Sequence, residues 1–252
     1  MVMTNETLHD RFIALADLPE QGRVVNLGCG AGPALQAFSR RCPAASLVGF
    51  DRSAQALDTA QERLQDHGGG VVLAAVDLRD RLPLNDESVD AVISSNLIEC
   101  LPDPALLLKE IWRVLRPGGR AVLSHSDFDA LVISGAPVEL DRRVCHAFAD
   151  DAPTWMDSSD GRIGRKLPGL ANASPLALTH VETLVTSSTS LDGHAGRRVE
   201  DIRGALQATA RRGQGYVEVA EIDEWYMAVQ QAATHGEFFF AETAVIVSVQ
   251  RL

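Results

Sequence analysis

The chain has 252 residues, of which 46% are apolar and 23% charged, and a formal net charge of −11. This length and balance are typical of one large globular domain, so we predict a single domain over residues 1–252. The excess of acidic side chains repels phosphates, so we expect no nucleic-acid partner.

The N-terminus and the cysteines predict a cytoplasmic protein. The first residues, MVMTNETLHDRF, are polar and lack the apolar core of a signal peptide. No apolar run is long enough to cross a bilayer, so we also expect no membrane partner. The cysteines form neither a CxxC pair nor a metal-ligand ladder, which favours free thiols and no metal site; they are Cys29, Cys42, Cys100 and Cys145.

The first half of the chain alternates apolar runs with helical patterns. Helices are predicted at 33–42, at 53–67 with Ser53 as its cap, and from Pro104, capped by Asp103, up to the sequence RPGG. Strands are predicted at RVVNLG (23–28), SLVGFD (46–51), VVLAAVD (71–77), VDAVISSN (89–96) and RAVLSHSD (120–127). Apolar strands that alternate with helices form parallel sheets covered on both faces. The predicted fold class is therefore α/β, doubly wound.

The second half has a looser pattern. Residues 128–175 contain one amphipathic helix, marked by Leu140 and Val144, and a polar glycine-rich run from 150 to 169. A strand at 178–191, a helix at 221–236 and a last strand at 237–252 follow, within a segment, 176–252, that we expect to complete the sheet. We interpret 128–175 as an insertion over the carboxyl edge of the sheet, where ligands of such folds bind.

A glycine loop joins the first predicted strand to its helix. Gly28, Gly30 and Gly32 would let the backbone approach a ligand closely. The dinucleotide fingerprint is G-x-G-x-x-G, but here the third glycine comes one residue early and Pro33 takes the sixth place. A dinucleotide site needs a small residue there, so the loop fits a pyrophosphate poorly.

Three polar residues close successive strands. Asp51 ends the second strand, roughly twenty residues after the loop, where a carboxylate can accept hydrogen bonds from ribose hydroxyls. That role suits NAD and S-adenosylmethionine equally. Asp77 ends the third strand, where it can accept a bond from an adenine amino group, and Asn96 ends the fourth.

With VLRPGGRAVLS (114–124) and the last strand, this set resembles the class I S-adenosylmethionine-dependent methyltransferases. It is most similar to the small-molecule enzymes of the ubiquinone and menaquinone type, from about Arg23 to Asp127 and again over 236–252. The resemblance implies a mostly parallel, seven-stranded Rossmann-like sheet with an antiparallel last strand, and a cofactor-binding core at 23–127.

The resemblance also implies roles for single residues. The loop backbone would lie along the methionine and sugar portions of S-adenosylmethionine, at Gly28, Cys29 and Gly30. Asn26 departs from the family, which usually has an acid there, and its neutral amide would weaken affinity rather than change the cofactor. The remaining positions follow the pattern: Asp51 for the ribose, Arg52 beside the adenine, Asp77 for its amino group, Leu78 against the ring and Asn96 near the methionine end.

Candidate acceptor residues follow the fifth strand. His125, at its carboxyl end, can take a proton near neutral pH, although a histidine satisfied in the core explains it as well. Asp127 would orient a substrate amine or cap the next segment. Trp155, in the expected lid, would support a ring or cation of the substrate, or simply anchor a solvated loop.

The sequence thus predicts a methyltransferase that acts on nitrogen or oxygen of a small polar metabolite, as a monomer or homodimer. An NAD(P)-dependent oxidoreductase is an alternative, disfavoured by Asp77, by Pro33 and by the lack of a Tyr-x-x-x-Lys pair. A non-catalytic, cofactor-binding regulatory protein is another, for which Asn26 is the only hint.

Overall fold

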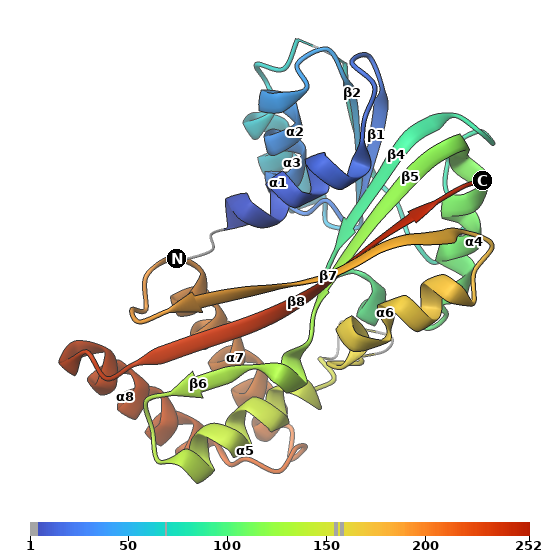
Figure 1. Ribbon diagram of the computed structural model, residues 1–252. Helices are drawn as coiled ribbons and strands as arrows, with labels where there is room; N and C mark the ends of the chain where they lie inside the picture. The colour runs from blue at the N-terminus through green and yellow to red at the C-terminus, as the bar shows by residue number, and fades with distance from the viewer. Residues whose placement is uncertain (1–4, 69, 154–155, 157–158) are drawn as a thin grey trace. The chain divides into compact units, whose positions relative to one another are not determined.

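The computed structural model describes residues 5–68, 70–153, 156 and 159–252. Its strands form one sheet in the order β3-β2-β1-β4-β5-β8-β6, with β7 paired to β8 (Figure 1). The predicted α/β class and the mostly parallel sheet with an antiparallel strand are confirmed. The sheet has eight strands rather than seven, because the short β6 (Val132–Ser134) adds to the edge of β8 (Phe239–Gln250).

The parallel part of the sheet comes from the first half of the chain. Strands β1, β2, β3, β4 and β5 alternate with helices, and Figure 1 shows α2 and α3 beside β1 and β2. The strands are β1 (Arg23–Leu27), β2 (Ser46–Asp51), β3 (Val71–Ala75), β4 (Val89–Ser95) and β5 (Leu115–Ser126). The helices are α1 (Asn5–Ala16), α2 (Pro33–Arg41), α3 (Ala54–Arg63), η1 (Ile98–Cys100) and α4 (Pro104–Val114).

The helix starts follow from local chemistry. The Ser53 hydroxyl accepts a hydrogen bond from the amide of Ala56 at 3.2 Å, and the Asp103 carboxylate accepts one from the amide of Ala105 at 3.0 Å. Both bonds satisfy amides that have no partner inside the helix. Helix α4 ends at Val114 before RPGG, as predicted. The RPGG sequence itself belongs to β5, where the pairing of β5 with β4 shifts in register.

The chain divides into two compact units. We call residues 6–125, 166–182 and 246–252 the first unit, and residues 126–165 and 183–245 the second unit. The expected lid, 128–175, contributes to both. The functional division into a 23–127 core, a 128–175 lid and a 176–252 segment stays a prediction. None of the described helices is long and apolar enough to span a membrane.

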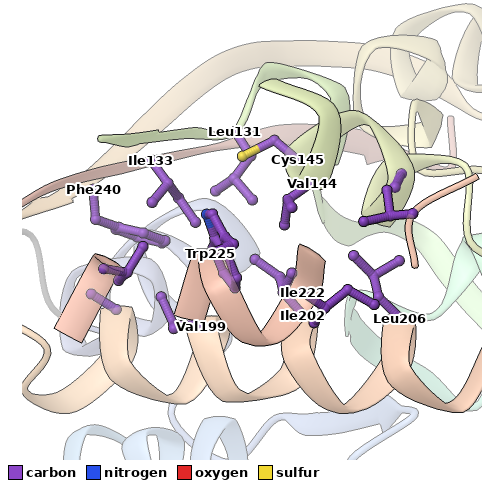
Figure 2. Packing of buried hydrophobic residues seen from close by; sticks show 14 of the residues in the cluster. Leu131, Ile133, Val144, Cys145, Val199, Ile202, Leu206, Ile222, Trp225 and Phe240 are labelled. Carbon is purple, nitrogen blue, oxygen red and sulfur yellow. The ribbon is translucent and has the colours of Figure 1, made fainter. Parts of the chain in front are cut away.

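The core of the second unit surrounds Trp225, which is fully buried (Figure 2). Its indole Nε1 donates a hydrogen bond to the Asp141 carboxylate at 2.9 Å, so the polar end of the buried ring is satisfied. Most of the surrounding side chains come from β6, β8 and three helices: α5 (Val138–Ala149), α7 (Gly193–Arg211) and α8 (Val219–His235).

Some elements differ from the prediction. Helix α6 (Ile163–Asn172) lies where we expect a polar loop, and it forms although Pro168 stands inside it. The 19-residue α7 and the strand β6 are also absent from the prediction. Strand β7 (Ala177–Ser188), helix α8 and the last strand β8 agree with it.

Candidate functional site

The loop between β1 and α2 turns on three glycines with positive φ. The φ angles of Gly28, Gly30 and Gly32 are 69°, 50° and 77°, values that L side chains rarely adopt. A Cβ on Gly28 would lie 3.2 Å from the Leu97 side chain, and one on Gly32 would lie 3.0 Å from Ala60. A Cβ on Gly30 would meet no described atom within 4 Å. The loop therefore packs against the protein at two glycines and faces open space at the middle one.

Asp51 ties the end of β2 to this loop. Its Oδ2 accepts a hydrogen bond from the amide of Gly30 at 2.8 Å, and its Oδ1 accepts one from the amide of Ser53 at 2.9 Å. A carboxylate offers about four acceptor positions, so two remain for hydroxyl donors. The half-buried Asp51 is thus held in place and still able to bind a diol such as ribose.

Cys29 contributes backbone rather than thiol chemistry. Its side chain is buried, and burial raises the pKa of the thiol to about 12. The thiol is therefore protonated and unreactive near neutral pH. A Cβ on Gly49 of β2 would lie 2.9 Å from the Cys29 sulfur, so the thiol fills space against the neighbouring strand.

Asp77 follows β3 at the same edge of the sheet as Asp51. The amide of Val76 donates to the carbonyl of Asp51 at 3.1 Å, which brings the ends of β2 and β3 together. The exposed Asp77 carboxylate forms an ion pair with Arg79, whose side-chain hydrogen bond lowers the pKa of Asp77 to about 2. Leu78 is buried and Arg52 is exposed.

Asn26 lies in β1 and Asn96 directly follows the neighbouring strand β4, both in the first unit. Asn96 follows β4 with a φ of 50°, and its backbone N–H donates to the carbonyl of Ser124 at 3.0 Å. The backbone of Asn96 is therefore held in place, while its side chain is exposed. Asn26 lies in β1 between Gly49 of β2 and Ile93 of β4, with only 4% of its surface exposed.

His125 is fully buried at the carboxyl end of β5. Its Nε2 lies 3.7 Å from Oε1 of Glu99, which is itself buried after β4. The sequence does not single out Glu99, because no motif marks an acid in NLIECLP. The structure thus adds a buried carboxylate near this imidazole, at a distance longer than a hydrogen bond. The catalytic role of His125 stays a prediction.

Asp127 belongs to the second unit and is buried there. Its carboxylate accepts hydrogen bonds from Nε and Nη2 of Arg165 at 2.5 and 2.7 Å. Its amide donates to the carbonyl of Thr243 at 2.8 Å. The other predicted substrate residue, Trp155, lies outside the described residues. Both roles stay predictions.

The sequence also gives no sign of a buried ionic group in the second unit. Glu242, in β8, accepts hydrogen bonds from Ser126 Oγ at 2.6 Å and Arg198 Nε at 2.7 Å. His194 Nε2 lies 3.3 Å from it. Burial opposes ionisation of Glu242, but His194 and Arg198 outweigh burial and lower its pKa.

The sequence matches a known family over part of its length. Residues 25–123 match the family described as a methyltransferase domain. An uncharacterised 37.1 kDa protein in a transposon of Streptomyces fradiae is 29% identical and covers 90% of this chain and 61% of its own. A malonyl-[acyl-carrier protein] O-methyltransferase from Marinomonas is 38% identical over 46% of this chain and 42% of its own. A ubiquinone/menaquinone biosynthesis C-methyltransferase from Desulfotalea psychrophila is 33% identical, over 48% of this chain and 49% of its own. The chain thus spans 42% to 61% of the length of these relatives.

Solved structures share the fold over nearly the whole chain. A geranyl diphosphate C-methyltransferase from Streptomyces coelicolor, in complex with S-adenosyl-L-homocysteine, superposes with a TM-score of 0.57 at 16% identity. The alignment covers 98% of this chain and 81% of that one. The [4+2]-cyclase SpnF gives a TM-score of 0.59 at 19% identity, with the same two coverages of 98% and 81%.

Proposed function

We propose that the chain transfers a methyl group from S-adenosylmethionine to a small molecule, because residues 25–123 match a methyltransferase domain and solved methyltransferase structures share the fold. The observation that carries the proposal is the hydrogen bond from the Gly30 amide to the Asp51 carboxylate, together with the open space next to the Gly30 Cα. One side of the loop is thereby fixed while the other can face a ligand.

The residues present fit this cofactor. Asp51 keeps two acceptor positions for the ribose hydroxyls, and Gly30 leaves room for the chain that joins sugar and methionine. Asp77 can accept a hydrogen bond from the adenine amino group, and Leu78 supplies an apolar contact for the ring. Arg52 would lie beside the adenine, and Cys29 and Asn96 along the methionine portion.

When bound, S-adenosylmethionine supplies a methyl group already activated on a sulfonium. The work left to the protein is to align the accepting atom and to exclude water. The rigid loop and the fixed backbone at Asn96 serve that alignment, because they hold the ends of β1 and β4 at one edge.

We further propose that His125 accepts the proton released by the substrate. Glu99, 3.7 Å from Nε2, would help to orient the imidazole. Because His125 is fully buried, the proton must reach it by a local movement or through a bound water.

For the acceptor, we propose a nitrogen or oxygen atom of a small polar metabolite. The expected lid is rich in charge, with Arg162 and Arg165 paired to Asp127 and Asp129, which suits a polar ligand better than an apolar one. The named relatives act on oxygen in one case and on carbon in the other. We retain Asp127 and Trp155 as the proposed substrate contacts, a cytoplasmic location, and a monomer or homodimer.

Thermal melting of the purified protein tests the cofactor. A ligand at about a hundred times its dissociation constant adds roughly 2.7 kcal/mol, which moves the midpoint by several degrees. We expect S-adenosylhomocysteine to raise the midpoint and NAD to leave it unchanged. Asp51→Ala should abolish the rise, while Asp58→Ala, an exposed aspartate on α3, should retain it. A rise with NAD instead would support the oxidoreductase.

Formation of S-adenosylhomocysteine tests catalysis separately. Methyl-labelled S-adenosylmethionine is incubated with a panel of amines, phenols and carboxylates, and the labelled product is separated. The likeness to a cyclase makes this step necessary, because the same fold occurs in a protein whose name records another reaction. Cofactor binding with no transfer to any of these acceptors would favour the regulatory alternative.

A further inference from the structure

The second unit contains a cavity of about 210 Å³. It lies where α5 and α7 end and where the loop between α7 and α8 passes. Helix C-termini carry partial negative charge, so both helix ends favour a cation. The residues on its walls that matter here are Asp150, Asp151, Leu206, Thr209, Tyr216 and Val217.

Asp151 lines this cavity and has one carboxylate oxygen without a hydrogen-bond partner among the described residues. The residue is only 6% exposed, and its Oδ1 accepts a hydrogen bond from Thr209 Oγ1 at 2.6 Å. Its Oδ2 is buried and has no hydrogen-bond partner among the described residues. A buried acceptor without a donor is costly, so a ligand that donates to Oδ2 would stabilise this site.

The neighbouring charges are paired elsewhere. Asp150 binds Arg162 Nη1 at 2.9 Å and accepts a hydrogen bond from the Tyr216 hydroxyl at 3.2 Å. Arg212 donates to Thr209 Oγ1 at 3.0 Å and to Gln214 at 3.1 Å. The nearby cations are therefore already paired beside the cavity. Because Oδ2 of Asp151 is itself buried, a bound donor reaches it by a small rotation of the Asp151 side chain.

We propose that this cavity binds the ammonium group of a small alkylamine, with Asp151 Oδ2 as the acceptor. Leu206 and Val217 give the alkyl part an apolar wall, and Tyr216 adds an aromatic residue that can contact the cation. A divalent metal fits less well, because such ions need several oxygen ligands. Within the described residues, no group of three His, Cys, Asp or Glu side chains could hold one.

The volume sets the size of the ligand. The cavity has room for roughly seven water molecules at about 30 Å³ each, and it is smaller than the pockets of about 300 Å³ or more that take drug-sized ligands. An amine with about four carbons fits this range. The site goes beyond the proposed methyl transfer and does not require the cofactor.

Nuclear magnetic resonance with n-butylammonium chloride tests the proposal. The ¹⁵N-labelled protein is titrated in an amine-free phosphate buffer, with and without S-adenosylhomocysteine. We expect saturable shifts at the amides of Thr209, Gly215 and Val217 under both conditions. The absence of saturable shifts at these amides would overturn the proposal, whatever happens at the cofactor loop.

Variants test whether the Asp151 carboxylate binds the ammonium group. Asp151→Asn keeps the shape of the side chain and should weaken binding at least tenfold, whereas Asp192→Asn, at the exposed start of α7, should not. If Asp151→Asn does not fold, Tyr216→Ala serves instead, because this half-exposed residue is replaceable, and it should weaken binding severalfold. Equal binding by the folded variant would contradict the proposal. So would equal shifts with n-butanol, or stronger shifts with MgCl₂ at the same ionic strength.

Discussion

The Asp51 carboxylate and the Gly30 amide are joined by a hydrogen bond of 2.8 Å, which fixes the loop after β1 to the end of β2. The bond uses one oxygen of the residue that we expect to bind ribose. The same contact therefore shapes the loop and orients the proposed cofactor ligand, so changes at either residue should affect cofactor affinity before they affect the fold.

Gly30→Ala should weaken S-adenosylhomocysteine binding by tenfold or more. The new Cβ would enter the open space in which we place the cofactor, and the positive φ would add about 1 kcal/mol of strain. Gly118→Ala is the matched control, because Gly118 also has a positive φ and no neighbour within 4 Å of a Cβ. Calorimetric titration compares the two. Similar affinities in both variants would remove Gly30 from the site.

Arg79→Ala should raise the pKa of Asp77 from about 2 towards the ordinary 3.8, because the hydrogen bond from Arg79 favours the charged form. The native pKa is the lower one, so the stability that the pair contributes is present above about pH 4 and is lost as the pH falls towards 2. A carbon NMR titration of the Asp77 carboxyl measures the midpoint. An unchanged midpoint would show that Arg79 does not hold this carboxylate in solution.

Glu242→Gln should lower the free energy of unfolding by about 3–5 kcal/mol, because it removes the buried carboxylate closest to the mostly buried Arg198, whose other acidic neighbour, Asp201, lies 3.5 Å away and is mostly exposed. Since the pKa of Glu242 is lowered in the folded state, its contribution is present above the usual pKa of a glutamate and decreases in acid. The variant should therefore lose part of the acid sensitivity of the wild type. Urea unfolding between pH 3 and pH 7 measures both effects, with the exposed Glu237→Gln as control.

His125→Gln should leave S-adenosylhomocysteine affinity within about twofold and lower methyl transfer by about 100-fold, the smaller end of what general-base catalysis contributes. Glu99→Gln should act in the same direction but less, since Glu99 orients the ring instead of taking the proton. The assay uses the acceptor that the labelled-methyl panel identifies. Methyl transfer at the wild-type rate in His125→Gln would show that His125 only packs in the core and takes no part in catalysis.

The parallel half of the fold was predictable because its signals are local. Ser53 and Asp103 cap helices where the sequence places caps, and the strands that end at Asp51 and Ser95 are mostly apolar. The second half was less predictable. Pro168 and nearby glycines hide α6, and Gly196 and Gly204 interrupt the pattern of α7, so tertiary packing decides both helices.

The proposed site also has a part that the sequence predicts and a part that it does not. The positions of Gly28, Gly30, Asp51 and Asp77 follow from spacing, because the ends of parallel strands share one edge. The partners of these residues do not. Arg79 on Asp77, Glu99 near His125 and Arg165 on Asp127 are contacts made after folding, and no motif in the sequence marks them.

The last residues of the chain anchor the helix that precedes β5. The Arg251 guanidinium donates to the carbonyls of Trp112, Arg113 and Leu115 at 3.1, 3.2 and 2.8 Å, and it pairs with Glu87 at 2.6 Å. The family match ends at residue 123, more than a hundred residues earlier in the chain. A fragment cut to the matched region would leave the C-terminal carbonyls of α4 without this donor, so such a fragment should be less stable than a chain that keeps Arg251.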